Sequence, residues 1–207
     1  NDVLDMSKIE SGQLELICRN IDLNGLLSEV KTLLETQARH KQIDFTVNTQ
    51  GIKQKWIAGD PIRIKQILMN ILGNAIKFTP EGGKVSLNAI QTLKNGTAVT
   101  TFVIADNGCG MTKDVIIKHW MTIGKSTKKK QFISKSGRVQ TGAKGIGRFA
   151  LDRISDKCVM FTASAEGKLI WKVDWEDFSK SDNITDVTAD LYKPNVSIDG
   201  FLDKVIN

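Results

Sequence analysis

The chain has 207 residues, 41% of them hydrophobic, which suits one globular domain of ordinary composition. No apolar run approaches the roughly 20 residues needed to cross a bilayer, and Cys18, Cys109 and Cys158 show neither disulfide nor metal-ligand spacing. These features exclude a membrane segment and a disulfide scaffold, and they favour a reducing, cytoplasmic setting. Much of the +6 formal charge falls in residues 125–135, which indicates a local feature and not an extended basic face, so a nucleic-acid partner is not expected.

The first part of the chain predicts two helices and three short strands. Residues 1–12 have a helical apolar pattern, but a helix of this length is marginal alone in water, so we expect it to belong to something longer. The other elements expected here are a strand over 13–21, a helix from its cap Asp22 through Arg39, and strands at 43–47 and 55–57 around a turn at Gly51.

The segment 60–79 predicts the helix around which the chain is organised. Asp60 is a natural N-cap, and Pro61 suits the first helical position. At about 100° per residue, one face collects Ile64, Ile67, Leu68, Ile71, Leu72, Ala75 and Phe78. A separate stripe carries Gln66, Asn70, Asn74 and Lys77. Amides and an ammonium in a row suit a hydrated metal and phosphate oxygens; the alternative is an amphipathic core helix with incidental polar residues.

The remainder of the chain predicts two hairpins, two helices and one long loop. Asn95-Gly96 between two alternating runs is a strong hairpin signal. A loop as long as 121–141 is usually functional or disordered. The expected elements are a turn at 80–83, strands at 84–93 and 97–105, a helix at 112–120, a helix at 145–154, a hairpin of 158–165 with 168–175 around Glu166-Gly167, and a last strand within 184–191.

A second polar motif, Asp106-Asn107-Gly108-Cys109-Gly110, follows the apolar run that ends at Ala105. A buried carboxylate at the end of a strand can accept a hydrogen bond from the exocyclic amine of adenine, where guanine would present a repelling oxygen. The two glycines allow a planar ring to lie against the backbone. The alternative is that Asn-Gly after a strand is simply a turn.

A third motif, residues 141–147, places glycines directly before a predicted helix. Exposed N–H groups at a helix N-terminus favour an anion, so a polyphosphate is the expected ligand. Lys144 adds a positive charge to the same stretch. The same stretch partly matches a dinucleotide fingerprint, but the polar residues 135–141 cannot be the buried strand that this fingerprint requires. Residues 124–127 imitate the end of a P-loop, but His119 stands where a glycine is required.

The order of the three motifs resembles the ATPase superfamily of DNA gyrase B, heat-shock chaperones, histidine kinases and MutL proteins, over roughly residues 14–175. The resemblance implies a two-layer α/β sandwich (the Bergerat ATP-binding fold), with helices on one face of a mixed, mostly antiparallel sheet. It implies ATP and Mg²⁺ as cofactors, bound between the helices and a lid at 123–141. The expected division is a dimerisation-helix remnant (1–12), an ATP-binding domain (13–193) and a C-terminal tail (194–207).

Roles for individual residues follow from the same resemblance. Asn74 would hold Mg²⁺, and Asn70 and Lys77 would act as catalytic residues beside the phosphates. Asp106 would bind the adenine amine. The glycines and the lysine expected to flank the base or close over the phosphates are Gly108, Gly110, Gly142, Lys144, Gly145 and Gly147.

The two halves of the chain resemble different branches of this superfamily. Residues 1–16 and 59–79 are similar to hybrid sensor histidine kinases, whereas 106–130 and 138–155 are similar to stand-alone ATPases of the chaperone and gyrase branch. This mixture suggests a chimera with its seam between 85 and 105. In the hydrolysing branches a glutamate that activates water stands one turn before the metal-binding asparagine, and here that position is Asn70.

The leading functional hypothesis is therefore a Mg-ATP-binding, histidine-kinase-like catalytic domain with little turnover alone. Neither His40 nor His119 suits a phosphoacceptor, so we expect the acceptor helix to come from another sensor kinase chain. The alternatives are a hydrolysing conformational switch of the chaperone branch and an inert nucleotide-binding hybrid. No membrane partner is expected for this fragment, and a monomer or weak dimer is expected.

Overall fold

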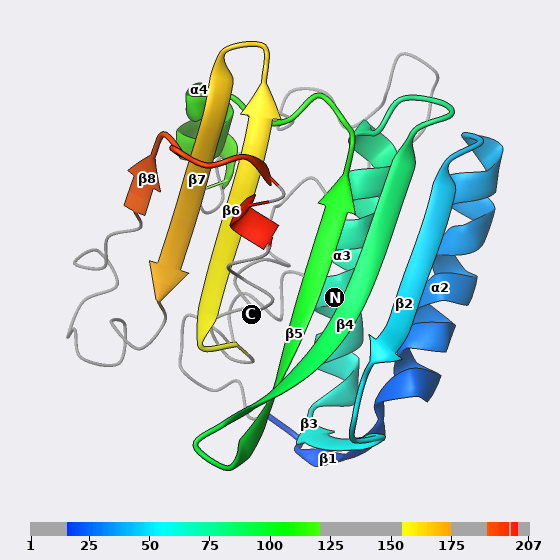
Figure 1. The fold of residues 1–207 in the computed structure, drawn as a ribbon. Helices are drawn as coiled ribbons and strands as arrows, with labels where there is room; N and C mark the ends of the chain where they lie inside the picture. The colour runs from blue at the N-terminus through cyan, green and yellow to red at the C-terminus, as the bar shows by residue number, and fades with distance from the viewer. Residues whose placement is uncertain (1–15, 121–154, 175–189, 199, 203–207) are drawn as a thin grey trace.

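The computed structural model describes residues 16–120, 155–174, 190–198 and 200–202 (Figure 1). In chain order its elements are β1 (Arg19–Asp22), α2 (Leu23–His40), β2 (Asp44–Gly51), β3 (Trp56–Gly59), α3 (Pro61–Phe78), β4 (Lys84–Lys94), β5 (Thr97–Asp106), α4 (Lys113–Val115), the π-helix η1 (Ile116–Trp120), β6 (Lys157–Ser164), β7 (Gly167–Asp174) and β8 (Asp190–Tyr192). No helix among the described residues is long and apolar enough to span a membrane.

The strands form three hydrogen-bonded groups, ordered β1-β3, β2-β4-β5 and β6-β7-β8. Strand β2 runs parallel to β4, and every other pair is antiparallel. Helices α2 and α3 lie side by side on one face of β2, β4 and β5 (Figure 1). The predicted class, helices on one face of mixed and mostly antiparallel strands, is confirmed, although the described strands hydrogen-bond as three groups and not as one continuous sheet.

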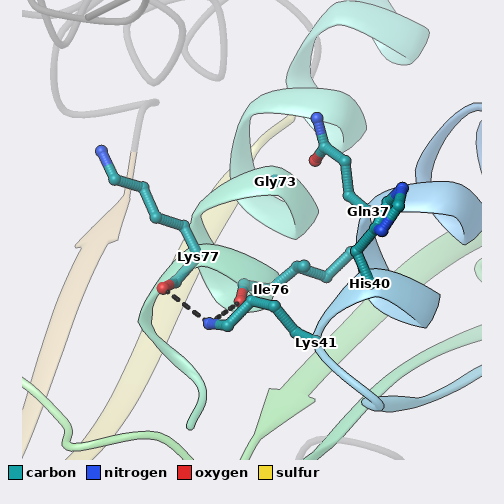
Figure 2. Close-up of a pocket in the computed structure, with 6 residues that line it drawn as sticks. All are labelled: Gln37, His40, Lys41, Gly73, Ile76 and Lys77. Carbon is teal, nitrogen blue, oxygen red and sulfur yellow. Dashed lines mark hydrogen bonds between the residues drawn. The ribbon is translucent and has the colours of Figure 1, made fainter. Parts of the chain in front are cut away.

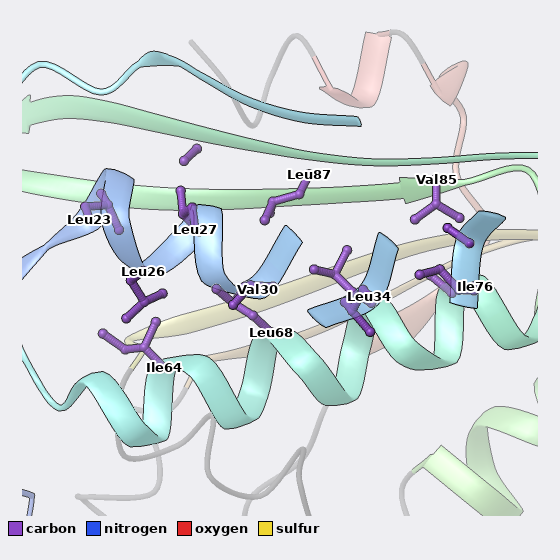
Figure 3. Close-up of a cluster of buried hydrophobic side chains, with 14 of the residues drawn as sticks. Leu23, Leu26, Leu27, Val30, Leu34, Ile64, Leu68, Ile76, Val85 and Leu87 are labelled. Carbon is purple, nitrogen blue, oxygen red and sulfur yellow. The ribbon is translucent and has the colours of Figure 1, made fainter. Parts of the chain in front are cut away.

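The main core lies between the two long helices and β4 (Figure 3). Helix α2 buries residues spaced three and four apart, as an amphipathic helix must, and β4 buries every second side chain, as a half-buried strand must. The central members are Leu23, Leu27, Val30, Leu34, Leu68, Leu72, Ile76, Val85 and Leu87, each at most 2% exposed. This packing fixes which side of α3 faces away from the core.

Helix α3 begins and ends as predicted, but its apolar face is rotated at the last turn. Phe78 was expected in the core and is 58% exposed, whereas Ile76, left out of the predicted face, is 2% exposed. The reason is geometric: Ile76 is four residues after Leu72, so it continues the buried ridge, while Phe78 lies about 200° around the helix from Ile76.

The predicted hairpin at Asn95-Gly96 is confirmed. Both residues have positive φ, 52° and 80°, as the two central positions of a tight hairpin turn require. The register continues from Lys94↔Thr97 to Val85↔Asp106. The hairpin therefore places Asp106 opposite Val85, the second residue of β4.

The predictions for the first strands were partly wrong. The strand predicted at 13–21 begins only at Arg19, and residues 13–15 lie outside the described part. Gly51 is the last residue of β2 and not a turn; a Cβ there would lie 2.8 Å from the carbonyl oxygen of Ala89 on β4, so glycine permits the close approach of the two strands. Strand β3 pairs with β1 and not with β2.

The later elements differ from prediction mainly at their ends. The helix predicted at 112–120 is a short α-helix, capped by Thr112, followed by the π-helix η1. In the second hairpin Ser164 pairs with Gly167, so the turn residues are Ala165-Glu166 and Gly167 starts β7. Of the last strand predicted within 184–191, residues 190 and 191 are described, and they belong to β8, Asp190–Tyr192. The predicted dimerisation-helix remnant and the helix at 145–154 lie outside the described residues.

The N-cap of α3 gives a first testable prediction. Asp60 is 7% exposed, and its Oδ1 accepts hydrogen bonds from the N–H groups of Ile62 (3.0 Å) and Arg63 (3.1 Å), while Oδ2 accepts one from Ile17 (3.1 Å). Asp60→Ala should lower the free energy of unfolding by about 1–2 kcal/mol, because the part-buried N–H groups of Ile17, Ile62 and Arg63 lose their acceptor. Urea denaturation measures this loss; Asp60→Asn, which keeps a capping oxygen, should lose less, and equal losses would contradict the capping role.

Candidate nucleotide site

The polar stripe predicted on α3 lies on the side of the helix away from the core. Asn70, Asn74 and Lys77 are exposed, and Gln66 is half-buried and accepts a hydrogen bond from Arg63 Nη1 at 2.9 Å. Residues four and three apart share one side of a helix, and the buried ridge of Leu68 and Leu72 holds the opposite side in the core. Two amides and an ammonium are thereby presented together along about two turns.

The second predicted motif stands at the end of β5. Asp106 Oδ1 accepts a hydrogen bond from the Gly108 N–H at 2.9 Å, which fixes the tight bend after the strand. The carboxylate was expected to be buried and is exposed. One oxygen is therefore used by the loop, and the other has no partner among the described residues, which leaves an acceptor available to a ligand.

The loop after Asp106 contacts the C-terminal end of α3. A Cβ at Gly108 would lie 3.1 Å from the carbonyl oxygen of Phe78 and 2.7 Å from Asp106 Oδ1. Asn107 is fixed as well, since its Oδ1 accepts a hydrogen bond from the Lys84 N–H at 2.7 Å. The structure thus brings the Asp106 motif against the last turn of the helix that carries Asn74 and Lys77.

Gly110 is required by its contact with β6. Its φ is +68°, and a Cβ there would lie 1.9 Å from the carbonyl oxygen of Ala163, a distance that no side chain can occupy. The neighbouring Met111 N–H donates to Thr162 Oγ1 at 2.7 Å. Sequence reasoning assigned the motif's glycines to stacking of a base; the structure shows that close backbone packing on α3 and β6 already requires them.

The third predicted motif lies outside the described residues. Gly142, Lys144, Gly145 and Gly147, with the predicted lid at 123–141, fall in the range 121–154. The described half of the site therefore consists of the α3 stripe and the Asp106 loop. The predicted metal ligand Asn74 offers an amide oxygen, which is a ligand type that Mg²⁺ accepts.

Sequence reasoning missed Lys41, which follows α2. Its ammonium donates to the carbonyl oxygens of Ile76 (2.9 Å) and Lys77 (3.0 Å) at the end of α3 (Figure 2). It also donates to the carbonyl oxygen of Thr79, the residue after the helix. A lysine after a helix is common in any sequence, so no local pattern pointed to these contacts.

A cavity of about 520 Å³ opens between the ends of α2 and α3 (Figure 2). It is lined by Gln37, His40, Lys41, Gly73, Ile76 and Lys77. Lys77 belongs both to this cavity and to the polar stripe, whereas Asp106 does not line it. His40, one of the residues that line this cavity, is exposed.

The cysteines differ in environment. Burial raises the pKa of the Cys158 thiol to about 11, so this group stays protonated and inert at neutral pH. Cys109, within the Asp106 motif, and Cys18 are exposed and unpaired in disulfides.

Residues 59–171 match the protein family described as "Histidine kinase-, DNA gyrase B-, and HSP90-like ATPase". The match spans more than half of the chain and includes both described motifs and the glycine motif. The chain therefore belongs to this ATPase family, and its domain is an ATP-binding catalytic domain of the histidine-kinase type.

Relatives and solved structures agree with this assignment. The chain is 39% identical over 111 residues to the signal transduction histidine-protein kinase BarA of Escherichia coli (strain K12), covering 54% of this chain and 12% of that protein. It is 43% identical over 82 residues to histidine kinase 3 of Arabidopsis thaliana, covering 40% of this chain and 8% of that protein. It is also similar to the crystal structure of full-length ShkA in complex with AMPPNP, at a TM-score of 0.56 and 30% identity over 77% of this chain and 31% of that one. The chain thus spans only a small part of the length of the relatives it matches.

Proposed function

We propose that this domain binds Mg-ATP and presents its terminal phosphate to a histidine supplied by another segment or chain. The observation that carries the proposal is the junction of the two described motifs, where Gly108 packs on the carbonyl oxygen of Phe78 at the end of α3. This junction brings an exposed carboxylate acceptor and a row of amides and an ammonium to one region of the surface. The amine of adenine needs an acceptor such as the carboxylate, and the phosphate oxygens need donors such as the amides and the ammonium.

The proposed roles follow the chemistry of each side chain. The Asp106 carboxylate oxygen that has no partner among the described residues accepts a hydrogen bond from the adenine amine. Asn70 and Lys77 contact phosphate oxygens. Gly142, Lys144, Gly145 and Gly147 complete the phosphate contacts, because glycines before a helix N-terminus offer N–H donors. Their placement remains a prediction.

Mg²⁺ fits the donor set of the described residues. Asn74 is exposed on α3 and contributes one amide oxygen, and Mg²⁺ in nucleotide sites usually takes only one or two protein ligands and completes its shell with phosphate oxygens and water. When bound, the ion neutralises phosphate charge during transfer. Asn74 would hold the ion, on the stripe that also carries Asn70 and Lys77.

We further propose that turnover without an acceptor is slow. Asn70 stands where the hydrolysing branches carry a glutamate, and an amide cannot take a proton from water at neutral pH. Neither histidine of the chain is assigned as acceptor, so the partner is the phosphoacceptor helix of a sensor kinase. We also propose that the domain is a cytoplasmic monomer or weak dimer. Its two halves resemble different branches of the superfamily, and we propose that the chain is a chimera with its seam between residues 85 and 105.

The test is calorimetric titration of the chain with a non-hydrolysable ATP analogue, with and without Mg²⁺. We expect saturable one-to-one binding that strengthens when Mg²⁺ is present, because Asn74 would hold the ion whose charge favours the phosphates. The analogue of GTP should bind more weakly than that of ATP. Absence of saturable binding in a folded sample would contradict the proposed function.

A further inference from the structure

The end of α3 is held by a cation from another element. The last carbonyl groups of a helix have no partner within the helix and carry its negative dipole end. Lys41 Nζ donates to three carbonyl oxygens at this end, those of Ile76, Lys77 and Thr79. Figure 2 shows the first two of these hydrogen bonds. An ammonium group has three donors, so this arrangement uses all of them on the backbone of the last turn of α3 and its C-cap residue Thr79.

The backbone around Lys41 makes further bonds to the turn that follows α3. The Lys41 carbonyl accepts from the Gly82 N–H at 3.1 Å, and the Asp44 N–H donates to the Gly83 carbonyl at 2.9 Å. Gln42, held at a φ of 51°, donates from Nε2 to Glu81 Oε1 at 2.9 Å. The turn after α2 and the turn after α3 are therefore joined as one unit.

That unit reaches the Asp106 loop directly. Gly83 lies between Thr79 and Asn107, since a Cβ there would lie 2.4 Å from Thr79 Cγ2 and 2.8 Å from Asn107 Oδ1. Asn107 Oδ1 also accepts a hydrogen bond from the Lys84 N–H, and Gly108 packs on the carbonyl group of Phe78. A displacement of the last turn of α3 would therefore move the loop that carries Asp106.

We propose that Lys41 is a positioning residue of the nucleotide site. It holds the last turn of α3, and with it Lys77, in register with the Asp106 loop without being a ligand of the nucleotide. The inference rests on the proposed function, because it concerns the geometry of that same site. Its consequence is that removing the Lys41 ammonium weakens nucleotide binding while the domain stays folded.

The experiment titrates the ATP analogue with Mg²⁺ into Lys41→Met, a variant of similar length without the charge. We expect affinity to fall roughly three- to tenfold, which lies within the range of couplings transmitted through packed contacts. Lys41→Arg, which keeps the cation and can still donate to some of the carbonyls, should recover part of the loss. Should Lys41→Met not fold, Lys41→Gln, which keeps donors but not the charge, is expected to show the same weakening.

Two controls separate positioning from general stability. Lys65→Met removes another lysine that joins α2 and α3, through its ion pair with Glu29 at 2.7 Å, but at the opposite end of the helices. Asp60→Ala destabilises α3 at its N-terminus. Both should keep the affinity of the unchanged chain at a temperature where all variants are folded.

The outcomes distinguish this inference from the proposed function. Weaker binding by Lys41→Met alone, with partial recovery in Lys41→Arg, supports positioning. If the unchanged chain binds the analogue and Lys41→Met binds it equally well, or if Asp60→Ala weakens binding as much, the inference is overturned and the proposed function stands. If the unchanged chain does not bind at all, the proposed function fails first.

Discussion

Asp106→Asn is expected to weaken binding of the ATP analogue at least about tenfold, because a hydrogen bond to a charged group contributes about 1.5–3 kcal/mol. The substitution is well matched to this loop. An asparagine oxygen can still accept the Gly108 N–H bond now made by Oδ1 at 2.9 Å, so the bend is kept. The other atom changes from an acceptor to an amide donor, which opposes the donating amine of adenine.

The same substitution should change the preference between bases. Guanine presents an oxygen where adenine presents its amine, so the new amide donor should reduce the disadvantage of the GTP analogue relative to that of ATP. Competition calorimetry with the two analogues measures the ratio. Asp44→Asn, at the exposed start of β2, serves as a control that removes one carboxylate elsewhere and should leave both affinities unchanged. A folded Asp106→Asn protein with unaltered affinity for the ATP analogue would remove Asp106 from the site.

Helix α3 and the β4–β5 hairpin could be predicted because their signals are local. Asp60 and Pro61 mark the start of α3, the apolar period fixes its buried ridge, and Asn95-Gly96 specifies a turn that few other residue pairs allow. Each signal acts between residues at most a few positions apart. The stripe that carries Asn70 and Asn74 then follows, because a buried ridge determines which side of a helix is exposed.

The supporting contacts of the site could not be predicted because their partners are distant in sequence. Lys41 and Ile76 are 35 positions apart, and Met111 and Thr162 are 51 apart. Gly110 has an evident turn signal, but its contact with Ala163 depends on where β6 lies. The exposure of Asp106 was also missed, because alternation along a strand does not show how far the strand's end extends beyond the neighbouring elements.

The identity of residue 70 determines the second large effect. Asn70 is exposed on α3, one turn before Asn74, and its amide can orient a water molecule but cannot remove its proton. A positioned general base typically contributes about 10²–10⁴ in rate. Asn70→Glu is therefore expected to raise the steady-state rate of phosphate release from ATP, by at most about 10²–10⁴-fold. A coupled phosphate-release assay under saturating Mg-ATP measures it.

Asn70→Gln is the matched control, because it lengthens the side chain as glutamate does without adding a base. It should leave phosphate release at the level of the unchanged chain. The pH dependence gives a further check: only the Glu variant should gain a rate that is lost as the pH falls and the new carboxylate becomes protonated. If the unchanged chain already releases phosphate as fast as the Glu variant, another residue must act as the base. The domain would then be an ATP-hydrolysing conformational switch. The proposal that it transfers the terminal phosphate of ATP to a histidine would be wrong.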